Sequence, residues 1–398
     1  MKRLRLWNPK EEHMLENKER KNILPSIAVI NEAAKRNNIL LDDLANSIFG
    51  EKAEEFLLFI QTSSLDTSLK FDYKILLKIA ENLRIPFGYL FLETLPKENR
   101  KVAEFRRKNP QHQISQTLQE SIRESEYKQI WYRDYLIENG QSPRYNKKLV
   151  NEKEIITTIK SLLDFEKLHK EPYNALKQMI ERLQNQDFLI FVASRINRSN
   201  NKKLDIEDFR GYCLYDKYAP VIFLNNQDSY KGKIFTLLHE LAHIFYGKNG
   251  ITLSDNEHQK IEKACNHIAG EILIPKELFL NKWDKTLNIS LNIDSMRNDF
   301  YLASDEALAT KARTLKLISQ KIYEEYIEEC NARPKKKPYS PNNKEKVFKD
   351  IIKENSKNFA EAIITQTYNN KLDFKTAMEY LGINEIKHFR GIQKEIGL

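Results

Sequence analysis

The chain has 398 residues, 41% hydrophobic and 30% charged, a globular composition that excludes fibrous and low-complexity proteins. Its formal net charge of +9 favours acidic partners such as nucleic acid, although 65 basic and 56 acidic residues equally fit an ordinary solvated surface. Three dispersed cysteines without a CxxC pair, a charged N-terminal segment and no apolar run of about 18 residues predict a cytoplasmic protein without a membrane partner.

Residues 1–95 are expected to form an N-terminal module, in which a charged leader at 1–24 precedes short helices at 25–95. Gly50 and Pro86 mark helix ends, because glycine breaks a helix and proline disfavours helical geometry in the residue before it. The predicted helices are Pro25–Arg36, Leu41–Phe49, Ala53–Gln61 and Asp72–Leu83. Residues 96–186 are expected to be a helical connecting region.

The pattern changes near residue 187. Phe188–Val192 and Ala219–Leu224 are short apolar runs rich in aromatic and β-branched residues, which is typical of strands. A helical pattern resumes at Lys233, so residues 187–331 form the predicted core. Residues 332–343, with three prolines and a run of lysines, read as a linker before a helical C-terminal domain at 344–398. These elements predict a mostly helical α+β fold with a small β-sheet, flanked by helical modules at both ends.

The segment IFTLLHELAHIFYG (Ile234–Gly247) contains the motif HExxH at His239, Glu240 and His243. On a helix, residues four apart lie one above the other, so both imidazoles can reach one zinc ion. Glu240 lies about 100° round the helix, close enough to hold a water beside the metal. The helix is expected to pack on its apolar side and to present the histidines to a cleft.

A catalytic zinc site needs a third protein ligand, which we expect from the next helix, Glu257–Leu273. Glu262 shares one face with the small residues Cys265 and Ala269, which would let the two helices approach closely. Glu262 is therefore the preferred ligand, and His258 and Glu257 remain alternatives. His267 lies about 140° round the helix from Glu262 and is a poor candidate.

Two segments together resemble the ImmA/IrrE metallopeptidase family: Phe209–Gly247 and Ile261–Pro275 (IEKACNHIAGEILIP). In that family a strand ending in Asn precedes the HExxH helix, and the next helix carries a pattern like E-x-x-A-N-x-F-A-x-x-L-L-x-P, whose Glu is the third zinc ligand. Glu262 falls on that position. Cys265 replaces the usual Ala and Ile268 the usual Phe. The resemblance covers about Asp187–Pro275.

The resemblance implies a zincin-like core and a zinc-dependent endopeptidase that cleaves a regulatory protein, such as a DNA-bound repressor, in a stress, phage or mobile-element response. Zn²⁺ would be held by His239, His243 and Glu262, with Glu240 as general base. Tyr246, on the histidine stripe, and Asn225, which ends the strand, are candidates for contact with the transition state or the substrate. For Tyr246, simple packing is the alternative.

Residues 25–95 also resemble the helix-turn-helix modules fused to this family, through Leu40–Ala45 and Leu77–Leu92. The candidate recognition helix, Ala53–Phe59, offers carboxylates and apolar side chains instead of the Arg, Asn or Gln that usually read bases. DNA binding and a protein-contact role therefore both stay open. The alternative function for the whole chain is a transcriptional regulator whose metal site is structural or sensory, which the carboxylate of Glu240 disfavours.

Two expectations concern access to the site. The strand Ala219–Leu224 is expected to present an edge to an extended substrate peptide, to lie in the core, or to do both. The leader or the C-terminal tail is a candidate for covering the cleft and restraining the enzyme.

Overall fold

The computed structural model describes residues 24–36, 39–62, 71–83, 87–95, 104–105, 115–146, 148–196, 202–247, 255–332 and 344–398, with the single residues 69, 85 and 198. The chain divides into two compact units, Met1–Asn99 and Arg100–Leu398. Among the helices in these ranges, none combines the length and apolar character that crossing a membrane requires.

The N-terminal unit is a helical bundle around its own apolar core. Its helices are α2 (Ile27–Arg36), α3 (Leu41–Phe49), α4 (Ala53–Thr62) and α5 (Tyr73–Leu83), with short 3₁₀ turns at Gly50–Lys52 and Phe87–Phe91. The four helices agree with the sequence patterns to within two residues at either end. Gly50 ends α3 with a positive φ of 55°, and Phe49 stacks on Phe56 of α4 at 4.6 Å between ring centroids.

The second unit is built on a small sheet of four strands: β1 (Glu104–Phe105), β2 (Leu189–Ala193), β3 (Gly211–Leu214) and β4 (Val221–Asn225). Their order is β1-β3-β4-β2, with β2 parallel to β4 and the other pairs antiparallel. The two predicted strands correspond to β2 and β4, and β3 was not predicted. Because β4 is paired on both sides, the expectation that it offers a free edge to a peptide is wrong, and the core interpretation is right.

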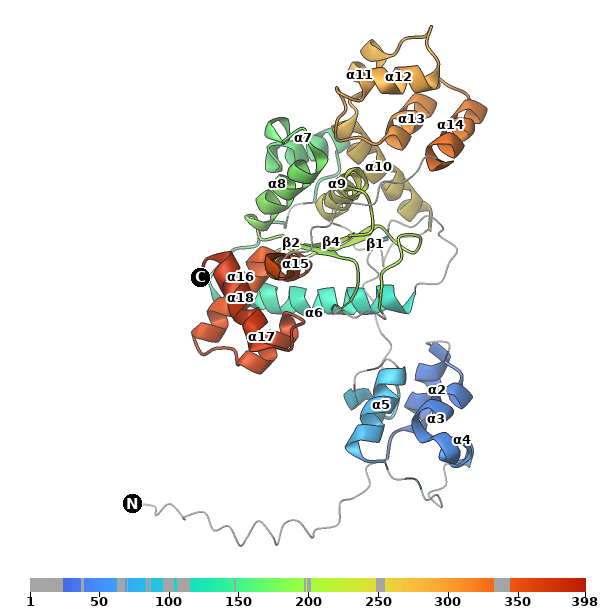
Figure 1. Ribbon diagram of the computed structural model, residues 1–398, viewed down its shortest axis with the longest axis vertical. Helices are drawn as coiled ribbons and strands as arrows, with labels where there is room; N and C mark the ends of the chain where they lie inside the picture. The colour runs from blue at the N-terminus through green and yellow to red at the C-terminus, as the bar shows by residue number, and fades with distance from the viewer. Residues whose placement is uncertain are drawn as a thin grey trace. The chain divides into compact units, whose positions relative to one another are not determined.

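Helices cover both faces of this sheet (Figure 1). Alternate residues of each strand point to opposite faces, so Ile190 and Ile222 join one apolar core while Leu189 and Phe223 join another. The first face packs against α7 (Glu152–Leu162), α8 (Pro172–Gln184), α9 (Tyr230–Tyr246) and α10 (Asp255–Leu273). The opposite face packs against α6 (Gln116–Glu138) and the C-terminal helices.

The remaining helices extend these two layers. On the α9 side lie α11 (Lys276–Lys282), α12 (Ile289–Met296), α13 (Asp305–Thr314) and α14 (Gln320–Ala332). On the α6 side lie α15 (Lys344–Asn355), α16 (Lys357–Tyr368), α17 (Phe374–Tyr380) and α18 (Ile386–Ile396). The predicted α+β, mostly helical class is confirmed, and the C-terminal helices share a core with the sheet.

Candidate metal centre

Helix α9 carries the HExxH motif through the middle of the second unit. The Ser229 side chain caps its first turn by accepting a hydrogen bond from the backbone N–H of Gly232, and Gly247 ends it in the left-handed region at φ 61°. Between these caps nearly the whole helix is buried, and His239 and His243 each keep only 1% of their surface exposed. The two histidine side chains are therefore almost fully covered, because the sheet packs on one side of α9 and α10 on another.

Helix α10 brings Glu262 to the two histidines. One carboxylate oxygen lies 3.1 Å from Nε2 of His243, the other lies 3.4 Å from Nε2 of His239, and the two Nε2 atoms are 3.0 Å apart. The Glu262 side chain is 24% exposed, so the cluster touches solvent mainly on its carboxylate side. Side chains from two helices thus converge on one point.

This donor set fits a metal ion. Nitrogen and oxygen atoms of His239, His243 and Glu262 all lie within 4.8 Å of one another, and neutral imidazoles with a carboxylate are ordinary ligands of a divalent transition metal. The side chains of the alternatives Glu257 and His258 lie outside the described residues. His267 is 55% exposed and lies 3.6 Å from Glu152, away from the cluster.

The electrostatics of Glu262 match a role as an anionic ligand. Burial alone would raise its pKa, but hydrogen bonds and charge interactions with His239 and His243 outweigh burial and hold the pKa well below its usual value. The carboxylate is therefore ionised, as a metal ligand must be.

Glu240 is fully buried beside the thiol of Cys213, a residue of β3. Burial, and after it the charge of the nearby Glu240, raise the pKa of Cys213, so the thiol stays protonated. Cys213 was not predicted as a site residue, because the four-residue run GYCL is too short to indicate a strand. Its neighbour Gly211 lets β3 approach α9, since a Cβ there would lie 2.5 Å from Thr236 Cγ2.

Tyr246 and Asn225 differ in what they can contact. Tyr246 is partly exposed at the end of α9, and burial raises its pKa to about 12, so its hydroxyl is protonated at neutral pH. Asn225 is fully buried; its amide nitrogen donates to the carbonyls of Asp205 and Phe209, and its Oδ1 accepts from the backbone of Gln227. Asn225 therefore organises the loops next to β4 and offers no surface to a substrate.

The C-terminal helices do not cover this centre, because they pack on the opposite face of the sheet from α9 (Figure 1). Covering by the tail helices is thus excluded for residues 344–398. The leader, residues 1–23, lies outside the described residues.

Residues 192–309 match the family model of the IrrE N-terminal-like domain, peptidase M78. The matched range contains the entire His239, His243 and Glu262 cluster together with Glu240. Comparison of the chain with curated proteins found no match. Comparison with solved structures found none either.

Proposed function

We propose, from the premise that residues 192–309 belong to the ImmA/IrrE family of metallopeptidases, that this chain is a zinc-dependent endopeptidase. The observation that carries the proposal is the convergence of His239, His243 and Glu262, with Glu240 on the same helix between the two histidines. Two histidines and one glutamate are the ligand set of catalytic zinc sites that keep one position open, whereas structural zinc sites are closed and commonly use cysteine.

Zinc in such a site supplies Lewis acidity and lowers the pKa of a water molecule to about 7. Residues of the chain itself are proposed to carry out the proton transfers. Glu240 is the group proposed to accept the proton of the attacking water and pass it to the leaving amine. Because Glu240 is fully buried, its carboxylate acts in a medium of low dielectric, where charge interactions are stronger than in water.

Cys213 and Tyr246 are proposed to assist the reaction in different ways. The protonated Cys213 thiol is proposed to donate to the carboxylate of Glu240 and so to restrain its orientation. The Tyr246 hydroxyl keeps its proton at neutral pH and is available to steady a developing oxyanion. For Tyr246 this role is secondary to packing, since the ring also contacts the core of the second unit.

The proposed substrate is a regulatory protein, with a DNA-binding repressor as the preferred class. The N-terminal unit is proposed to contact protein rather than DNA. Helix α4, the candidate recognition helix, exposes Glu54 and leaves 53% of Leu58 exposed, and a carboxylate repels phosphate while an exposed leucine suits a protein surface. None of the three cysteines forms a disulfide, which agrees with the proposed cytoplasmic location.

The test is metal content of chelator-free protein by mass spectrometry, combined with cleavage of a repressor panel. Wild type is expected to carry near-stoichiometric zinc, His239→Ala to lose it, and Glu240→Gln to keep it while losing cleavage. Absence of zinc from all three proteins would overturn the metal centre. Zinc-loaded wild type and Glu240→Gln with equal cleavage would overturn Glu240 as the base. A zinc-loaded wild type that cleaves no repressor would favour a structural or sensory metal site.

A further inference from the structure

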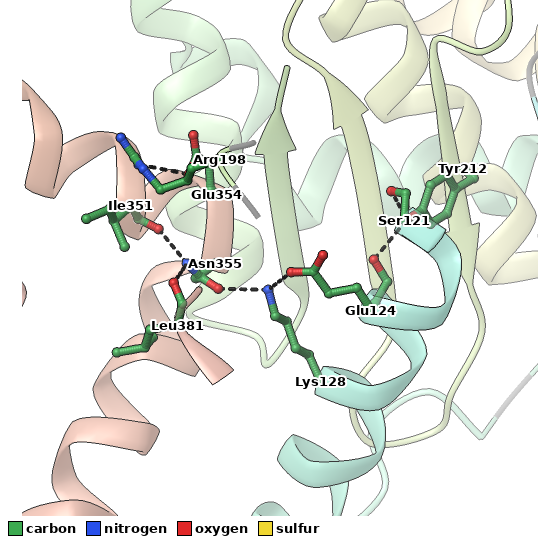
Figure 2. A network of polar contacts seen from close by, with 10 residues as sticks. Ser121, Glu124, Lys128, Arg198, Tyr212, Ile351, Glu354, Asn355 and Leu381 are labelled. Atoms are coloured by element: carbon green, nitrogen blue, oxygen red, sulfur yellow. Dashed lines mark hydrogen bonds and ion pairs between the residues drawn. The ribbon is translucent and has the colours of Figure 1, made fainter. Parts of the chain in front are cut away.

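A second polar site lies on the sheet face opposite the metal centre. A cavity opens between α6, the ends of β2 and β4, and α15, with Phe191 and Phe223 among its apolar lining residues. Its charged lining comprises Lys128, Arg195, Arg198, Glu124 and Glu354. Figure 2 shows Glu124, Lys128, Arg198 and Glu354 gathered from segments far apart in the sequence, with Lys128 between Glu124 and Asn355.

Lys128 is the interior cation of this cavity. Its side chain is 7% exposed, and its ammonium donates to Glu124 at 2.6 Å and to Asn355 at 2.8 Å. Asn355 is itself buried, and its amide nitrogen donates to the carbonyls of Ile351 and Leu381, which fixes its Oδ1 toward Lys128. The ammonium is therefore a buried cation whose partner Glu124 is 28% exposed, and such a pair is weak evidence of a purely stabilising role.

The rim of the cavity carries a second ion pair that is more accessible. Arg198 donates to Glu354 at 2.9 Å, and their side chains are 34% and 21% exposed. Burial raises the pKa of Glu354, although the charge of Arg198 opposes the change.

The charge and size of the cavity define what it can hold. Three cationic and two acidic side chains leave one positive charge in excess. An ammonium has three donors, and the structure describes two acceptors for that of Lys128, Glu124 and Asn355. The interior volume is about 30 Å³, which holds roughly two water molecules or one small group.

We propose that this cavity is a binding site for a small oxyanion, a carboxylate or a phosphate group, held between Lys128 inside and Arg198 at the rim. The chemistry shared by both ligands is a compact negative charge with several acceptor oxygens, which matches an ammonium and a guanidinium. The site is separate from the metal centre, since Phe191 and Phe223 belong to the core on the other side of the sheet.

The experiment is calorimetric titration of the full-length protein with inorganic phosphate and, separately, with acetate, at constant ionic strength set by chloride. One saturable site is expected for at least one of the two anions. Arg198→Gln is expected to weaken that binding at least about tenfold, which corresponds to 1.4 kcal/mol. Arg133→Gln removes the same charge from a side chain of α6 that is similarly exposed, at 33%, but lies outside the cavity lining, and it should leave binding unchanged.

The two anions distinguish the ligand classes. Saturation by phosphate alone assigns a phosphate group, and saturation by acetate assigns a carboxylate; either result supports the proposal. Absence of a saturable site with both anions would overturn it, as would equal weakening in Arg198→Gln and Arg133→Gln, which would indicate unspecific attraction to a basic surface. Thermal unfolding of each variant confirms that it is folded during the titration.

Discussion

The carboxylate of Glu262 lies 3.1 Å from Nε2 of His243, although the two residues belong to separate helices. Apolar packing fixes this relationship, because Cys265 and Ala269 on α10 are fully buried in the same core as Leu241 and Ala242 of α9. The ligand geometry therefore depends on how closely two helices pack, and small residues at the contact allow the close approach.

Glu262→Gln is expected to lower metal affinity by more than the roughly 10–100-fold typical of losing an outer-shell partner, because an anionic ligand is replaced by a neutral amide. Metal retained after dialysis against graded chelator measures the change. His267→Gln is the matched control, since His267 lies on the same helix but is exposed and outside the cluster. Equal retention by Glu262→Gln and wild type would remove Glu262 from the ligand set.

The HExxH helix and Glu262 could be predicted from the sequence because both follow from the helical repeat, which is a local property. Strand pairing is not local. The run that forms β4 is equally apolar in a central or an edge strand, and only the unpredicted β3 makes it central. Cys213 was missed for the same reason, since its position beside Glu240 depends on that strand.

The sequence also could not predict where the C-terminal helices pack. Their amphipathic patterns show that each buries one face but not what covers that face. In the structure Ile351 and Phe359 join the core beneath the sheet. Helix α9 is buried because β3, β4 and α10, which lie next to it along the chain, and α7 and α8, which lie farther away, all pack on it.

Gly211→Ala is expected to destabilise the second unit by about 1–3 kcal/mol, because the added Cβ would lie 2.5 Å from Thr236 Cγ2 and 2.6 Å from the Phe223 carbonyl. Urea unfolding measures the loss. Gly270→Ala is the control, since a Cβ there meets no atom within 4 Å and an alanine within a helix stabilises by roughly 0.5–1 kcal/mol. Similar midpoints for both variants would show that β3 does not need the close approach to α9.

Lys233 makes stability depend on pH. It is 3% exposed, and burial, followed by the positive charge of Lys353, lowers its pKa from 10.5 to about 8. Between these values the unfolded chain binds more protons than the folded one, so the cost of charging Lys233 is fully present below pH 8 and disappears as pH approaches 10.5. Wild type should therefore gain about 2 kcal/mol relative to Lys233→Met between pH 7 and pH 9.5.

Urea unfolding of both proteins at the two pH values measures this gain. Lys349→Met removes an exposed lysine of α15. Its free energy of unfolding should differ from that of wild type by the same amount at both pH values. If the difference between wild type and Lys233→Met also stays constant, Lys233 titrates as in the unfolded chain and the assignment is wrong.

Ser356 joins the C-terminal helices to the edge of β2. Its Oγ accepts from the backbone N–H of Ile190 at 3.0 Å and from Gln184 at 2.9 Å, and donates to Asn358 at 2.7 Å. Ser356→Ala leaves these buried partners without that oxygen, and the expected loss is about 1–3 kcal/mol. Because serine and alanine both carry a Cβ at the positive φ of 65°, the backbone strain is shared and the difference isolates the hydroxyl.

Urea unfolding again measures the effect, with Ser295→Ala as control. Ser295 is exposed and donates only to Asn292 of its own helix among the described contacts, so its loss should stay within about 0.5 kcal/mol. If Ser356→Ala falls within the same limit, the Ser356 bonds do not stabilise the docked helices. Those helices would then be held in place by apolar burial at residues such as Ile351 and Phe359 and by other polar contacts, such as those from Asn358 to the Gln184 and Phe188 carbonyls.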